Sequence, residues 1–345
     1  MLGIVVKIWC APFTRVNANN QLWAMTLRKW RGKEALPKPT IKRDPSKKKF
    51  CDPEKASNAV KMELAVGRIA EACGLQHLLP KISVASVKGV MPETGHPVDW
   101  DGLFMTEAPG ISVYSAAYWD VKPSIIEEVL MRRVNSSQVV EAAIFDLLTS
   151  QCDRHSNNIF IDEQGGLTLI DNGDALGHQD MCPEGFSLNS LFLPSTPEHT
   201  YKAVGKKFAQ TGSSLWVTPS PLPHIIMDYR CHAPNSRIGG NYPPNVKQCL
   251  HRISGGTEQE IQLDFGLLNG DMARVLKQRA TDMTEKGFEW TLYNGEPRNP
   301  TKHRYLPQPT CCKMHQAPAE DLVWGLPWMF YCDDGWLPNI DLHGM

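Results

Sequence analysis

Two short apolar segments separated by a glycine-rich turn constrain the fold more than any other feature of the chain. The first segment is Ile159–Ile161, the second is Leu167–Ile170, and the turn Glu163–Gly166 lies between them. Runs of β-branched and aromatic residues on either side of such a turn predict a β-hairpin. A hairpin here returns the chain to the point where its first strand begins.

Three polar residues lie at the open end of this hairpin. Asp153 and Asn158 precede the first strand, and Asp171 directly follows the second. The hairpin would therefore bring Asp171 back beside Asp153 and Asn158. Phosphoryl transfer needs such a set: a carboxylate orients the nucleophile, and an Asn and an Asp hold a metal ion against the phosphates. We interpret Asp153 as the catalytic carboxylate, and Asn158 and Asp171 as metal ligands.

Each of these residues also has an ordinary structural explanation. Asp171, followed by Asn172-Gly173, is typical of a turn, and Asn158 is typical of a loop amide that bonds to the backbone. We expect Arg154 to pair with a neighbouring carboxylate and His155 to be structural. The combination of these residues with the hairpin, rather than any one residue, indicates the chemistry.

The segment before the polar loop predicts a buried helix. Apolar residues cover most of its sides, as expected of a core helix: Val139, Val140, Ala142–Phe145, Leu147 and Leu148. Asn135, Ser136 or Ser137 would cap its N-terminus. A rigid helix that leads into a polar loop is suited to positioning chemical groups.

Composition limits the classes of partner and compartment. The 345 residues suffice for one two-lobed domain or two ordinary domains, and a formal net charge of −1 gives no positive field, so we expect no nucleic-acid partner. We also expect no transmembrane segment and no signal peptide at Met1–Lys7. Read literally, the chain is cytoplasmic. The alternative is the Golgi or secretory lumen, if the N-terminus is incomplete, where ten cysteines could pair.

The N-terminal half combines strands with one helix. Ile4–Val6, 82–90 and Leu103–Met105 read as strands, and residues 57–74 read as a helix. Pro109-Gly110 predicts a turn, typical of a hinge.

Two charged features of this half have an ordinary interpretation. Glu63 lies in the predicted helix and, taken alone, is typical of a surface carboxylate. Residues 31–55 carry prolines and the Lys47–Lys49 cluster, which favours a solvated loop.

The C-terminal half has a weaker pattern. Residues 178–245 are rich in Pro, Ser, His and Asn and predict long loops. Residues 244–253 and 268–287 predict helices, and 301–345 predicts an irregular tail.

The polar loop and the residue after the hairpin resemble the catalytic loop and metal-binding segment of the phosphatidylinositol 3-/4-kinase-like atypical kinases. The flanks more closely resemble the secretory-pathway kinases, the family of Golgi casein kinase and the glycan xylosylkinase. In that family a helix of the type Ala-Ala-Ile-Phe-Asp precedes Asp-Arg-His, and Asp-Asn-Gly follows the hairpin. This chain has Ala142–Asp146, Asp153–His155 and Asp171–Gly173.

The resemblance implies an α+β class and a two-lobed, atypical protein-kinase-like fold. A small β-rich nucleotide-binding lobe would span 1–108, and a larger, mainly α-helical catalytic lobe would span 109–300. The segment 301–345 would be a tail.

The resemblance also implies a site for ATP with Mg²⁺ or Mn²⁺. Lys38 would pair with the phosphates and with Glu63. Lys29 is the alternative, because Pro37 departs from the family pattern. Glu107 and Ala108 would lie at the hinge that presents backbone groups to adenine.

The implied activity is transfer of the γ-phosphoryl group to a hydroxyl of a protein Ser or Thr or of a glycan. One alternative is a phosphoinositide kinase, with Lys47–Lys49 facing an anionic membrane. The other is an inactive pseudokinase scaffold, suggested by the departure beside Lys38 and by the lack of a recognisable glycine-rich phosphate loop. Asn158 departs from the secretory family, and the cysteine pattern does too, so the family's luminal disulfides are not carried over and the disulfide state stays open.

Overall fold

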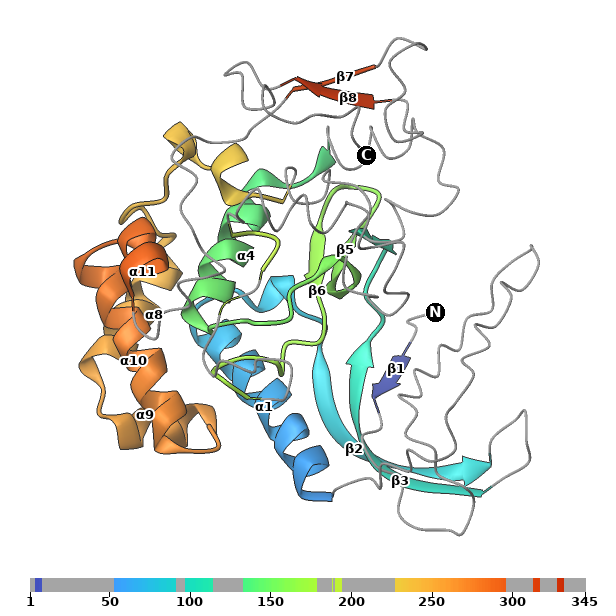
Figure 1. Cartoon of the computed structure of the whole chain (residues 1–345). Coiled ribbons are helices and arrows are strands. Elements are labelled where there is room, and N and C mark those ends of the chain that lie inside the picture. The colour runs from blue at the N-terminus through green and yellow to red at the C-terminus, as the bar shows by residue number, and fades with distance from the viewer. Residues whose placement is uncertain are drawn as a thin grey trace, which may run out of the picture.

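Helices and short antiparallel sheets both contribute to the fold, which confirms the predicted α+β class. The computed structural model describes residues 4–7, 53–90, 97–113, 133–178, 188, 190–193, 227–295, 313–316 and 328–331. The predicted loop at 31–55 lies outside these residues up to residue 52, as do Lys29 and Lys38. At 53–55 the loop prediction is wrong, because these residues form the first turn of a helix, which proline tolerates at its first position. Helices α1 (Pro53–Ala72) and α4 (Ser136–Leu148) occupy the centre of the described elements (Figure 1).

The strands form small antiparallel sheets. They are β1 (Ile4–Lys7), β2 (Ile82–Val90), β3 (Pro97–Thr106), β4 (Ile111–Ser112), β5 (Ile159–Ile161) and β6 (Leu167–Leu169). One three-stranded sheet has the order β1-β3-β2, and a second has the order β4-β5-β6. Ile159 lies opposite Leu169, so the hairpin predicted from the sequence is confirmed. The predicted irregular tail contains one regular pair, β7 (Lys313–Gln316) with β8 (Trp328–Tyr331).

The segment Glu107–Gly110 connects the two sheets, because β3 ends just before it and β4 begins just after it. Gly110 has φ +82°, and a Cβ atom there would lie 1.9 Å from the carbonyl oxygen of Ile161. Only glycine fits a left-handed position with such a close backbone approach. The predicted turn is therefore held directly against β5.

Helix α1 has one apolar face buried in the core. It begins at Pro53, whose missing N–H is tolerated in a first turn, and Gly74 follows its end with φ +71°. At Gly67 a Cβ atom would lie 3.1 Å from the Cδ1 atom of Ile82, so this glycine gives β2 close access to the helix. The buried residues include Met62, Ala65, Val66, Ile69 and Ala70.

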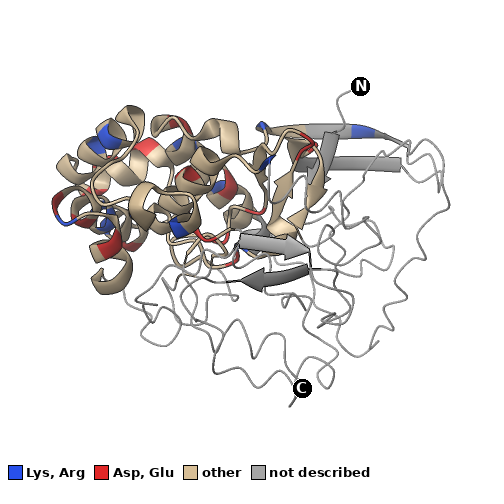
Figure 2. Cartoon of the chain, turned by 90° about the horizontal axis from the view of Figure 1, so that it is seen from above, with Lys and Arg blue, Asp and Glu red and all other residues tan. Residues whose placement is uncertain are grey.

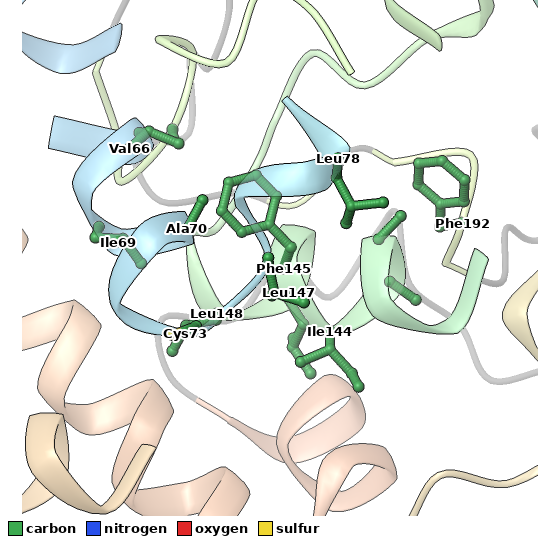
Figure 3. Close-up of a cluster of buried hydrophobic side chains, with 14 of the residues drawn as sticks. Val66, Ile69, Ala70, Cys73, Leu78, Ile144, Phe145, Leu147, Leu148 and Phe192 are labelled. Carbon is green, nitrogen blue, oxygen red and sulfur yellow. The ribbon is translucent and has the colours of Figure 1, made fainter. Parts of the chain in front are cut away.

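Helix α4 is the central core helix that the sequence predicts. The Asn135 side chain caps it by accepting a hydrogen bond from the backbone N–H of Gln138. Phe145, Leu147 and Leu148 of α4 lie in one cluster with the buried face of α1 (Figure 3). The polar loop therefore starts from a helix held by apolar side chains.

Four helices follow in the C-terminal half: α8 (Pro244–Gly255), α9 (Glu258–Phe265), α10 (Gly270–Glu285) and α11 (Phe288–Asn294). Helices α8 and α10 confirm the two predicted segments. Helix α9 was not predicted because it is short, although its capping signals are present. Thr257 and Glu260 form a capping box, and Gly266 ends the helix with φ +70°.

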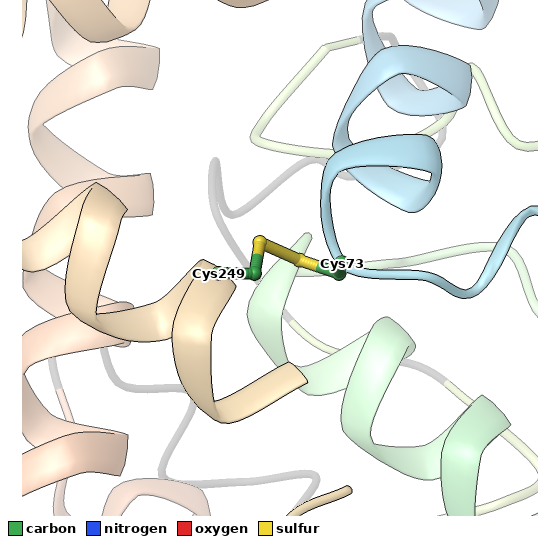
Figure 4. The surroundings of a disulfide bond; sticks show 2 residues. All are labelled: Cys73 and Cys249. Atoms are coloured by element: carbon green, nitrogen blue, oxygen red, sulfur yellow. A yellow bond between two sulfur atoms is a disulfide. The ribbon is translucent and has the colours of Figure 1, made fainter. Parts of the chain in front are cut away.

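A disulfide joins two helical segments that are far apart in the sequence. Cys73, which follows α1, is bonded to Cys249 on α8 at a sequence separation of 176 residues (Figure 4). Cys152 and Cys231 are disulfide-bonded as well, so the described cysteines are all oxidised. The sequence left the disulfide state open, and the structure shows these cysteines bonded. Residue spacing could not reveal a pair formed by distant segments.

The described surface is mixed in charge. Figure 2 shows acidic and basic residues interspersed over the helical part, in keeping with the formal net charge of −1. Among the helices that the structure describes, none is long and apolar enough to cross a membrane.

Removing the disulfide by the double change Cys73→Ala and Cys249→Ala should lower the free energy of unfolding by about 2–5 kcal/mol, because a cross-link over a long loop restricts the unfolded chain. Denaturant unfolding without reductant measures this difference. Equal unfolding midpoints for the two proteins would contradict the expected role of the bond.

Candidate functional site

The loop after α4 is polar and yet mostly buried. Gln151 is fully buried, Arg154 is 1% exposed and Asp153 is 8% exposed. Buried polar groups need hydrogen-bond partners, and their bonds therefore define the shape of this loop.

Gln151 fixes the backbone that carries Asp153. Its Oε1 atom accepts hydrogen bonds from the N–H groups of Cys152 (3.0 Å) and Asp153 (3.2 Å). Its Nε2 atom donates to the carbonyl of Asn172 at 3.4 Å. The start of the loop is thereby tied to the segment after β6.

Asn158 joins both halves of the predicted site. Its Nδ2 atom donates to the carbonyl of Asp153 at 2.9 Å, and its own carbonyl accepts from the N–H of Ile170 at 3.0 Å. The residue before Asp171 is thus bonded directly to Asn158. Because the first bond uses the amide nitrogen, the amide oxygen is the atom able to coordinate a cation.

Asp171 occupies a tight turn with φ 56°. Asp is one of the few side chains that tolerate this left-handed region. The following Asn172 is buried, and its Nδ2 atom donates to the carbonyl of Leu169 at 3.0 Å. Ordered residues therefore lie on both sides of Asp171.

Glu63 of α1 lies against this turn. It is only 2% exposed, so its interpretation as a surface carboxylate is wrong. A Cβ atom on Gly173 would lie 3.2 Å from the Cγ atom of Glu63 and 3.6 Å from its Cδ atom. The small residue after Asp171-Asn172 makes room for the Glu63 side chain, and α1 thereby meets the loop segments.

The remaining predicted residues lie apart from this loop in the sequence. Ala108 is buried and Glu107 is half-buried, on the connection between the two sheets. Lys38 lies outside the described residues, so its pairing with Glu63 stays a prediction.

Arg154 does pair with a neighbouring carboxylate, as predicted, and that carboxylate is Asp146 of α4. The Nε atom of Arg154 lies 3.2 Å from Oδ2 of Asp146, and both side chains are fully buried. Ser190 donates to the same carboxylate at 2.7 Å. Burial raises the pKa of the Asp146 carboxyl, while Arg154 and Ser190 oppose that increase.

The sequence interpretation missed Asp146, Gln151 and Asn172 as organising residues. One signal for Asp146 was available, since a carboxylate on an otherwise apolar helix requires a buried partner. Nothing in the pattern identifies that partner or the contacts of Asn172.

His155 lies next to the Asp153 carboxylate. Its Nδ1 atom accepts from the N–H of Asn157 at 3.1 Å, so the proton of the neutral ring is on Nε2, which lies 3.7 Å from Oδ2 of Asp153. Burial, with a smaller contribution from the charge of Arg154, lowers the pKa of His155 to about 4. The neutral ring therefore faces Asp153 as an N–H group.

A cavity of about 580 Å³ lies between α1, the segment Gly177-His178 and the turn from α9 to α10. It is lined by Asn58, Lys61, Gly177, His178, Gly266, Leu267, Leu268, Asn269 and Met272. Within the described part of the chain, no group of three or more His, Cys, Asp or Glu side chains is placed to hold a metal ion. A metal site at Asn158 and Asp171 would have one carboxylate.

Comparison with known proteins adds no relative. No protein-family model matches the chain, and no curated protein matches it.

Gly173→Ala should lower the free energy of unfolding by about 1–3 kcal/mol, because the added methyl group overpacks the contact with Glu63. Gly240→Ala is the matched control, since nothing lies within 4 Å of a Cβ atom there. Denaturant unfolding of both variants measures the difference. Equal stabilities would argue against close packing between Glu63 and the turn.

His155 should remain neutral until the pH falls to about 4. In the unfolded chain the ring takes up a proton near its ordinary pKa of about 6.5, so this group's contribution to stability is complete above that pH. That contribution is lost as the pH falls from about 6.5 towards 4. NMR of the histidine rings measures the titration, with the signal missing in His155→Gln identifying His155. A midpoint near 6.5 would contradict the buried environment.

Proposed function

We propose that the protein is an ATP-dependent kinase with a two-lobed, atypical protein-kinase-like fold. It transfers the γ-phosphoryl group to a hydroxyl of a protein Ser or Thr or of a glycan. One observation carries this proposal: the β5-β6 hairpin holds the Asp171 turn against the loop of Asp153 and Asn158, and Glu63 packs against the same turn. Phosphoryl transfer requires these residue types together.

The connection between the sheets supports the proposed division into lobes. The β1-β3-β2 sheet with α1 would form the nucleotide-binding lobe, and the boundary near residue 108 coincides with the Glu107–Gly110 segment. Backbone groups of Glu107 and Ala108 would contact adenine there. Lys38, or Lys29, would pair with the phosphates and with Glu63.

The residues present suit a magnesium or manganese ion held together with a nucleotide. The amide oxygen of Asn158 and the carboxylate of Asp171 are hard oxygen ligands. Mg²⁺ in nucleotide sites takes few protein ligands and completes its shell with phosphate oxygens and water, so a single carboxylate is sufficient. When bound, the ion would neutralise negative charge on the phosphates.

Asp153 would orient the acceptor hydroxyl and take its proton on the carboxylate. Its backbone is already fixed by Gln151 and Asn158, so little reorganisation is needed during the reaction. The Nε2–H group of His155 faces the same carboxylate and would help to keep it oriented.

The disulfide favours a protein or glycan acceptor over a phosphoinositide. Disulfides persist in oxidising compartments, such as the secretory lumen. Anionic phosphoinositides belong to the cytoplasmic leaflet, which faces a reducing compartment. The oxidised Cys73–Cys249 pair therefore supports a luminal or extracellular acceptor.

Asp153→Asn should lower turnover by about 10²–10⁴-fold, because it removes the general base, and should leave binding of Mn²⁺-ATP largely unchanged. Asp264→Asn is the control, since Asp264 lies exposed on α9 in a pair with Arg252. Phosphoryl transfer from γ-labelled ATP measures turnover.

The assay has three acceptor arms: a Ser/Thr peptide library, a panel of soluble glycans, and liposomes with phosphatidylinositol. Transfer in either of the first two supports the proposal, and transfer only to the liposomes supports the lipid-kinase alternative. Full transfer by Asp153→Asn would refute the role of Asp153. Absence of Mn²⁺-ATP binding by the unmodified protein would refute the kinase assignment itself.

A further inference from the structure

We propose that Arg154 is the positioning residue that holds the two halves of the site in register, an inference whose functional part rests on the proposed kinase activity. Arg154 follows Asp153 and comes from the same loop. Its guanidinium group reaches the segments of Asn158 and Asp171. We assign it no direct part in the chemistry. Its contacts, burial and geometry carry the inference.

The guanidinium group of Arg154 is anchored on α4. Its Nε atom donates to both carboxylate oxygens of Asp146, at 3.3 Å and 3.2 Å, and Nη2 donates to Oδ1 at 3.2 Å. A planar fork of this kind fixes the orientation of the guanidinium as well as its position. Ser190 holds the carboxylate from a separate segment.

The donors that remain are directed at the two residues that flank Asp171. Nη1 donates to the carbonyl of Ile170 at 2.8 Å, and Nη2 donates to Oδ1 of Asn172 at 2.7 Å. The two acceptors belong to the residues immediately before and after Asp171, whose φ is 56°. Nη1 also approaches the carbonyl of Asn158 at 3.4 Å. One side chain therefore contacts the residues on both sides of Asp171 and the backbone carbonyl of Asn158.

Stability alone is a poor reason to bury such a pair. Taking two charges out of water offsets most of their attraction, and apolar residues of similar size often stabilise a core as well or better. A buried arginine whose several donors all have fixed acceptors is instead well suited to defining one geometry.

The test compares Arg154→Lys with Arg230→Lys. Lysine keeps the charge at either position but loses the fork. Arg230 is a matched control, because it is also buried and donates through Nε and Nη2 to Asp228, in the C-terminal half. Asn172→Ala is a second variant, which keeps Arg154 but removes its acceptor on one side of Asp171, together with the bond from Asn172 Nδ2 to the carbonyl of Leu169.

The rate of amide hydrogen exchange, measured without ligands, tests the positioning role directly. The reporters are the N–H of Ile170, which bonds to Asn158, and the N–H of Cys152, which bonds to Asp174. Arg154→Lys should speed their exchange by about ten-fold or more relative to Arg230→Lys, in line with local opening of the segment. Asn172→Ala should act in the same direction. Equal exchange in Arg154→Lys and Arg230→Lys would overturn the proposal.

The affinity for Mn²⁺ in the presence of ATP tests the functional consequence. Electron paramagnetic resonance of the ion measures this affinity. Arg154→Lys should weaken it by about 10- to 100-fold, as removal of outer contacts to metal ligands does, and Arg230→Lys should not. Loss of local protection without any Mn²⁺-ATP binding by the unmodified protein would refute the kinase function while leaving the positioning role intact. Unchanged protection in both Arg154→Lys and Asn172→Ala would refute the positioning role alone.

Discussion

The buried ion pair between Arg154 and Asp146 is the interaction on which the arrangement of the site depends. A charge removed from water is tolerated only where its partners satisfy it, and here those partners come from α4, the end of β5-β6 and the segment at Ser190. Losing one member would leave an uncompensated charge in the core. Because the buried charges need hydrogen-bond partners, the pair links segments that apolar packing alone would leave free to shift.

Apolar packing supplies the frame around this pair. Helices α1 and α4 share one cluster of buried side chains, and the Cys73–Cys249 disulfide ties the end of α1 to α8. Glu63 lies on the buried side of α1, so the same face that forms the core also delivers a carboxylate to the Asp171 turn. A rigid core helix can place one polar group accurately because its neighbours are fixed by close packing.

The sequence predicts what is encoded locally and fails where distant segments meet. Helix α4 and the hairpin are predictable because their periodicity and turn residues lie within a few positions of one another. The burial of Glu63 is not predictable in this way, because Glu63 packs against Gly173, a residue far along the chain. The disulfide belongs to the same class, because residue spacing does not encode contact between α1 and α8. Helix α9 is a different case, because its capping box is a local sequence signal. The helix is only eight residues long, too short for a clear apolar period.

Backbone conformation and backbone hydrogen bonds also hold the site in place, in addition to side-chain packing. Ser150, Asp171 and Leu176 have positive φ, which Asp tolerates but which is costly for Ser and Leu, and they lie in the two segments joined at the site. Leu176 donates its N–H to the carbonyl of Thr149 at 2.8 Å, and Cys152 donates to Asp174 at 3.1 Å. These bonds clamp the segments together on either side of the strained residues. Strain persists only where the surroundings over-determine a conformation. The close fit of the two segments therefore holds Asp171 in one backbone conformation beside the loop of Asp153 and Asn158.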